Sequence, residues 1–210
     1  MFKNYRTIGI NVSCEIIIEK SKFIGTIKKV TSEEEAVSFI NEIKRKYWDA
    51  THNCSAFLIN NNEMRSSDDG EPAGTAGKPI LECVKKNNLQ NVSVVVTRYF
   101  GGIKLGAGGL IRAYTAATQE VIKHAGIEEN IFHQSFQLIL DYEYWNKIEY
   151  FFKSHKIFYE KPIYLDKISV TFYTTEASGI LEEIINRGNG SIIINELPSK
   201  YLPIQLEKPL

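Results

Sequence analysis

Residues 91–124 read NVSVVVTRYFGGIKLGAGGLIRAYTAATQEVIKH, and they contain three patterns in succession. The β-branched run from Val92 to Val96 has the length and composition of a buried strand. Five of the chain's 14 glycines follow between Gly101 and Gly109. Apolar residues then recur at helical spacing, at Leu110, Ala113, Tyr114, Ala117 and Val121. The stretch therefore predicts a central strand that passes through a glycine-rich loop into a helix.

This glycine-rich loop has the features of an anion-binding surface. Glycines let backbone N–H groups approach a ligand, and the first turn of a helix carries unpaired N–H groups and partial positive charge. The loop fits neither of the named nucleotide-binding glycine motifs, and a structural loop is the alternative. Because basic residues accompany the glycines, we favour a surface that binds nucleic acid or another anion. Its predicted members are Arg98, Gly101, Gly102, Lys104, Gly106, Gly108, Gly109, Arg112 and Lys78.

Composition and charge are ordinary for a globular chain of 210 residues, with 43% hydrophobic residues. Lys and Arg total 25, as do Asp and Glu, which excludes a generally basic nucleic-acid-binding protein but allows a local basic patch. No apolar run reaches the roughly 18 residues of a membrane helix, and the first residues resemble neither a signal peptide nor a transit peptide. We therefore expect a cytoplasmic protein without membrane contact. The three cysteines, Cys14, Cys54 and Cys83, are too few and too widely spaced for a disulfide framework or a zinc site.

The hydrophobic pattern before the central stretch predicts the other elements of a first domain. Strict alternation from Ile8 to Ile18 predicts one long half-buried strand, and 23–30 predicts a strand that returns beside it. Ser32 as N-cap, with Glu35 three residues later, predicts a helix that ends near Tyr47. The remaining elements expected are a strand over 53–59, a turn at 60–62, a short strand over 64–67 and a helix that opens at Lys78-Pro79.

The pattern restarts between Glu128 and His133, where we place a domain boundary. The predicted order after it is βαββαβ, with strands near 136–140, 157–165, 168–173 and 191–194 and helices near 144–152 and 180–185. This is the ferredoxin-like layout, in which two helices cover one face of an antiparallel sheet. The sequence thus predicts an α+β protein with domains at 1–128 and 132–210, and the prolines after Leu197 predict an extended or loose tail.

Two further clusters are candidates for chemistry. Asp68, Asp69 and Glu71 could hold Mg²⁺, but we favour a solvated acidic turn. His52 and Cys54 lie two residues apart on a predicted strand and so point to one face, which would permit a thiolate nucleophile. In an apolar strand a buried, inert cysteine is the more common outcome. We therefore assign no catalytic residue and keep these five side chains as the alternative.

Four motifs resemble the IMPACT/YigZ family, which occurs in bacteria and eukaryotes. SDDGEPAGTAGKPILE at 67–82 and VVVTRYFGGIKLGAGGLIRAY at 94–114 carry the resemblance, with SKFIG at 21–25 and HNCSAF at 52–57 in the right order. The second domain is similar to the C-terminal domain of the bacterial members. The resemblance implies an N-terminal β-α fold like that of ribosomal proteins and the fourth domain of elongation factor G. It also implies a C-terminal domain like that factor's fifth.

The resemblance also implies an association with translation. Eukaryotic IMPACT restrains an amino-acid-starvation kinase, but it carries an extra N-terminal interaction domain without counterpart in this sequence, so we do not expect that role. We expect a non-enzymatic protein that binds RNA or the ribosome and modulates translation, without cofactor or metal. Two alternatives remain open: an enzyme acting on a phosphorylated or nucleotide ligand in a cleft between 101–112 and 68–71, and a module that docks on a translation factor. The sequence does not predict the oligomeric state.

Overall fold

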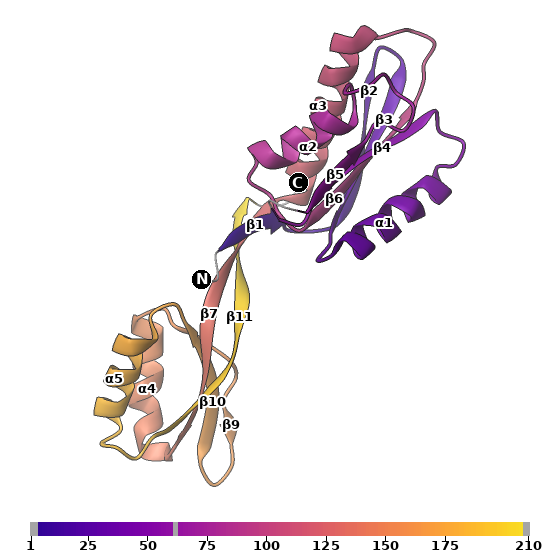
Figure 1. The fold of residues 1–210 in the computed structure, drawn as a ribbon. Coiled ribbons are helices and arrows are strands. Elements are labelled where there is room, and N and C mark those ends of the chain that lie inside the picture. The colour runs from indigo at the N-terminus through magenta and orange to yellow at the C-terminus, as the bar shows by residue number, and fades with distance from the viewer. Residues whose placement is uncertain (1–3, 61–62, 208–210) are drawn as a thin grey trace. The chain divides into compact units, whose positions relative to one another are not determined.

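The computed structural model describes residues 4–60 and 63–207, and it divides the chain into two compact units (Figure 1). One unit holds residues 4–130 together with 203–207, and the other holds 131–202. Each unit has its own hydrophobic core. The predicted α+β class is confirmed. Among the described residues, no helix has the length and apolarity needed to cross a bilayer.

The first unit is built on a five-stranded antiparallel sheet with three helices against it. The strand order is β2 (Val12–Ile18), β3 (Ser21–Lys29), β6 (Val92–Tyr99), β4 (His52–Leu58) and β5 (Met64–Ser67). The helices are α1 (Glu33–Lys46), α2 (Gly77–Lys86) and α3 (Gly106–Ala125). Val94 and Val96 of the central strand pack in the core with α2 and α3, whereas Val95 packs with α1. The predicted central strand is therefore buried on both faces.

Local signals set two of the helix ends. The Ser32 hydroxyl accepts a hydrogen bond from the Glu35 N–H at 3.3 Å, and the Glu35 carboxylate accepts one from the Thr31 N–H at 2.6 Å. These bonds satisfy N–H groups at the start of α1. The second signal is at the C-terminal end of α3, which stops at Gly126, whose φ of +66° favours glycine.

The prediction of one continuous strand from Ile8 to Ile18 is wrong. The chain instead forms β1 (Tyr5–Ile8), which pairs with β7 (Ile127–Leu140), and β2, which pairs with β3 in the other sheet. The change of sheet occurs at Gly9, where a Cβ atom would lie 2.9 Å from the Ala125 carbonyl oxygen. Alternating hydrophobicity continues across this break, so periodicity alone did not reveal it.

The second unit has the predicted order of strands and helices, except that the strand expected over 157–165 is divided into two short strands. Its elements after β7 are α4 (Tyr142–Ser154), β8 (Phe158–Tyr159), β9 (Ile163–Tyr164), β10 (Ile168–Thr174), α5 (Ala177–Arg187) and β11 (Ile193–Glu207). β7 pairs with both β10 and β11, and β10 pairs with β8 and β9. Two strands are longer than predicted. β7 begins before the expected boundary, and β11 runs on through Pro198 and Pro203, which is compatible with an edge strand.

Candidate functional site

A cavity of about 380 Å³ lies beside the glycine-rich loop of the first unit. The strand register places His52 opposite Arg98, and Arg98 opposite Phe23, so these side chains share one face of the sheet. The cavity is walled by that face, by the loop that carries Glu71 and by the first turn of α3. Its wall includes His52, Glu71, Arg98, Phe100, Lys104 and Gly106. The structure therefore brings parts of all three predicted clusters to one place.

A buried ion pair forms the polar part of this wall. The Arg98 Nη1 atom lies 2.6 Å from Glu71 Oε1, and the Tyr114 hydroxyl donates to the same oxygen at 2.8 Å. Arg98 is only 5% exposed, and its guanidinium lies 5.5 Å from the ring centres of Phe23 and Phe100. Burial raises the pKa of Tyr114, which keeps the phenol protonated as a donor. The charge of Arg98 is thus offset by Glu71 inside the unit.

Asp68 has a different role from Glu71. Its carboxylate accepts hydrogen bonds from the N–H groups of Gly74, Ala76 and Gly77 at 2.9, 3.1 and 2.9 Å. Burial raises the pKa of Asp68, but these three donors outweigh burial and hold the pKa below its ordinary value. Asp68 therefore closes the loop and satisfies N–H groups at the start of α2.

The carboxylates of the acidic loop are bound by groups of the protein itself. Asp69 accepts from Lys44 Nζ at 2.5 Å and from the Asn53 N–H at 2.7 Å, while Glu71 faces Arg98. The three carboxylates therefore diverge toward separate partners. Within residues 4–60 and 63–207, no cluster of three or more His, Cys, Asp or Glu side chains could hold a metal ion.

His52 and Cys54 also have separate partners. His52 Nδ1 donates to the Asp69 carbonyl oxygen at 2.8 Å, and His52 Nε2 lies 3.9 Å from Glu71 Oε2. Cys54 Sγ lies 2.9 Å from the Asp68 carbonyl oxygen, within the core. Burial raises the pKa of the Cys54 thiol to about 12, so almost no thiolate forms near neutral pH. His52, and not Cys54, is the member that reaches the cavity.

The glycines of the loop fall into different classes. A Cβ atom on Gly101 would lie 2.0 Å from the Lys20 carbonyl oxygen, so Gly101 is required by close packing. Gly102 and Gly106 have φ values of +86° and +68° with open space around them, so they are required by backbone conformation. Gly108 has neither constraint, and its nearest neighbour is the Arg112 side chain.

The predicted basic residues do not all meet at this cavity. Lys104 is exposed on its wall, next to the start of α3. Lys78 is exposed beside a separate hollow between α2 and α3, which Lys86 also lines. Arg112 is exposed on α3 and lines neither hollow. Apart from the paired Arg98, Lys104 is the predicted basic residue at the cavity.

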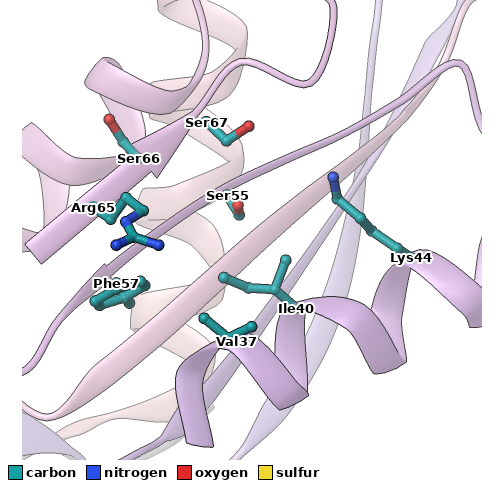
Figure 2. Close-up of a pocket in the computed structure, with 8 residues that line it drawn as sticks. All are labelled: Val37, Ile40, Lys44, Ser55, Phe57, Arg65, Ser66 and Ser67. Carbon is teal, nitrogen blue, oxygen red and sulfur yellow. The ribbon is translucent and has the colours of Figure 1, made fainter. Parts of the chain in front are cut away.

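A smaller hollow of about 150 Å³ lies on the opposite face of the same sheet, between α1 and the hairpin of β4 and β5 (Figure 2). Figure 2 shows Val37, Ile40 and Lys44 on the helix, opposite Phe57 and Arg65 on the strands. Both cations have partners, since Lys44 binds Asp69 at 2.5 Å and Arg65 binds Glu33 at 2.7 Å. Because both cations of this hollow are held in ion pairs, we regard the cavity beside α3 as the stronger candidate.

Comparisons with known proteins agree on one family. Residues 19–122 match the family model described as the Impact N-terminal domain. The IMPACT family member YvyE of Bacillus subtilis (strain 168) is 40% identical over 206 residues, covering 96% of this chain and 95% of the relative. The IMPACT family member YigZ of Escherichia coli (strain K12) is 33% identical over 136 residues, covering 63% and 67%. A solved structure described as a hypothetical protein has a similar fold, with a TM-score of 0.60 at 24% identity over 94% of this chain and 99% of that one.

Proposed function

Because this chain belongs to the IMPACT family, we propose that it is a cytoplasmic protein that binds single-stranded RNA, free or in the ribosome, and thereby modulates translation. The role in translation rests on the family resemblance. The RNA contact rests on the cavity beside α3 and on its rim. The proposal does not require a chemical reaction.

The observation that carries the RNA contact is the uncapped start of α3 beside Lys104. In the described part of the chain no side chain caps this helix, and its first turn contains no acidic residue. The unpaired N–H groups at such a helix end attract anions. Since Arg98 and Glu71 offset each other, Lys104 and the helix end supply the excess positive charge at this wall. A phosphate group is the anion that suits them.

An exposed aromatic ring lies beside this positive region. Phe100 is 46% exposed and lines the same cavity as Lys104. Aromatic side chains next to a basic groove stack on bases that are free of a duplex, with little dependence on base identity. The combination favours single-stranded RNA over double-stranded RNA.

Filter binding of a single-stranded RNA at two salt concentrations tests the proposal. Lys104→Ala should weaken binding several-fold and reduce the slope of log affinity against log salt by roughly 0.7 to 1. Lys123→Ala is the matched control, because Lys123 is exposed in the last turn of the same helix, away from the cavity. The control should bind like the original protein.

Three outcomes would overturn the proposal. Equal losses in Lys104→Ala and Lys123→Ala would show that binding follows total charge and not this surface. Absence of RNA and ribosome binding at low salt, together with thermal stabilisation by one small phosphorylated compound, would favour an enzyme. Binding to a purified translation factor in place of RNA would favour a docking module.

A further inference from the structure

His52 and Glu71 lie beside each other on the cavity wall and, while the His52 ring is neutral, present two hydrogen-bond acceptors. The Asp69 carbonyl oxygen can only accept, so His52 Nδ1 must carry a proton to make the 2.8 Å bond. In the neutral ring Nε2 is then an acceptor. Nε2 lies 3.9 Å from Glu71 Oε2, which is also an acceptor, and both residues line the cavity.

Neither acceptor has another partner in the described residues. The hydrogen bonds from Arg98 and Tyr114 both go to the other carboxylate oxygen, Glu71 Oε1. For Oε2, the polar group recorded within 4 Å among the described residues is the His52 ring. Both residues line the cavity, so a ligand that enters it can bring donors to these acceptors. The pair is therefore suited to a ligand that brings two adjacent donors, one for each acceptor.

Unmet donors lie on the same cavity wall. The first turn of α3 has no side-chain cap, and Lys104 is exposed beside it. Arg98 is 5% exposed, yet its Nε–H has no hydrogen-bond partner among the described residues. A buried donor of a charged group is rarely left without an acceptor. The wall thus offers donors to an anion and acceptors to a pair of hydroxyl groups.

We propose that this cavity binds a ribonucleotide with a free 2′,3′-diol, whose hydroxyls donate to His52 and Glu71 and whose 5′-phosphate meets Lys104 and the start of α3. The base would stack on the exposed ring of Phe100. A cavity of about 380 Å³ is within the usual size of small-ligand sites. The inference rests on the proposed RNA-binding function and names the part of the RNA that this cavity recognises, the ribose diol. Either the 3′ end of an RNA or a free ribonucleotide carries this chemistry.

The first test changes the ligand and leaves the protein unaltered. Adenosine 5′-monophosphate is compared with its 2′-deoxy and 3′-deoxy forms, and an RNA oligonucleotide with a free 3′-diol is compared with the same oligonucleotide carrying a 3′-phosphate. Each hydroxyl removed should weaken binding about tenfold, as expected for a hydrogen bond to a charged or buried acceptor. Discrimination by the mononucleotides alone identifies a free ribonucleotide, and discrimination by the oligonucleotides identifies an RNA end. Both results support the proposal.

The second test changes the protein. His52→Ala should reduce the preference for the diol over the deoxy forms to about twofold or less. His52→Gln should keep part of the preference, because its amide oxygen can take the place of Nε2. His124→Ala is the matched control, since His124 lies in the last turn of α3 and bonds to the Glu120 carbonyl oxygen.

Equal binding of ribose and deoxyribose ligands, or binding by neither nucleotides nor RNA ends, would overturn the inference. If RNA still bound in a salt-dependent manner through Lys104, the proposed function would survive that result. Loss of all RNA binding, with diol-dependent binding of the mononucleotide intact, would refute only the proposed function.

Discussion

Replacement of Asp68 by Ala should destabilise the first unit by about 2–4 kcal/mol. The carboxylate holds three backbone N–H groups, and two of them, those of Ala76 and Gly77, belong to buried residues. Water can replace the bond to the less buried Gly74, but the other two donors would lose their partner at about 1–2 kcal/mol each. Asp68→Asn keeps an acceptor oxygen and loses the charge, so it should cost about half as much.

The dependence on pH has a definite sign. Because the folded pKa of Asp68 is lowered, its charged form contributes stability above the ordinary aspartate pKa of about 3.9, and that contribution is lost as the pH falls through the lower folded pKa. The difference in stability between the original protein and Asp68→Asn should therefore be largest near neutral pH. It should shrink below about pH 4.

Urea unfolding should be followed through the amide NMR signals of β6, because the two units need not unfold together. Asp49→Ala is the control. Asp49 is an exposed aspartate of the same unit that accepts a hydrogen bond from Tyr99 at 2.8 Å, so its loss should cost about 0.5 kcal/mol or less. If Asp68→Ala lost no more stability than Asp49→Ala, the proposed closure of the loop by Asp68 would be refuted. It would also be refuted if the difference in stability between the original protein and Asp68→Asn grew as the pH fell.

Three other perturbations have clear expected outcomes. The Cys54 thiol, whose pKa burial raises to about 12, should not react with a thiol reagent at pH 8 until the protein unfolds, and prompt stoichiometric labelling of Cys54 by mass spectrometry would contradict this. Gly101→Ala should lower stability by about 1–3 kcal/mol, because its Cβ atom would meet backbone atoms. Gly108→Ala should be neutral or should stabilise the protein by up to about 1 kcal/mol. Thermal melts of the two variants check this, and the reverse order of stability would be inconsistent with the packing of the loop. Arg98→Met should lower the free energy of unfolding by about 3–5 kcal/mol, because it leaves Glu71 buried and unpaired. Adding Glu71→Gln should restore part of that loss, as measured by urea titration. A double variant less stable than Arg98→Met would show that the two residues are not coupled in this way.

Much of the fold could be predicted because the signals were local. The capping residues Ser32 and Glu35 predicted the start of α1, and Gly126 predicted the end of α3. The valine run predicted a strand that is buried on both faces, and the second unit follows the predicted order except that the strand over 157–165 is divided into β8 and β9. These features depend on neighbours in sequence, so single-chain patterns carry them. At Gly9 the local signal was the lone glycine within a strand pattern, which indicates a bulge or a close backbone approach, but its neighbour, the Ala125 carbonyl, is remote in sequence.

The candidate site was less accessible to sequence reasoning. Arg98 was predicted as part of an exposed anion surface, and its pairing with Glu71 depends on the path of a loop 27 residues away. His52 was considered only together with Cys54, although the register places it opposite Arg98. The place of His52 at the cavity follows from the pairing of β4 with β6. This pairing could be used only if the strand order were already known. The enzyme alternative placed a cleft between the glycine loop and the acidic loop, and residues of both loops line the cavity.

The bonds that join Cys54, Tyr114, Glu71 and Arg98 have a consequence for how the molecule assembles. Their partners are 60, 43 and 27 residues apart in the chain. None of these bonds can form within a single hairpin or helix, and each requires separate elements to have docked. In any partly folded state the charges of Glu71 and Arg98 would remain in water, where they are well solvated. The cavity wall should therefore appear late in folding and in one cooperative step, so a population of molecules would contain complete sites and unformed ones with few intermediates.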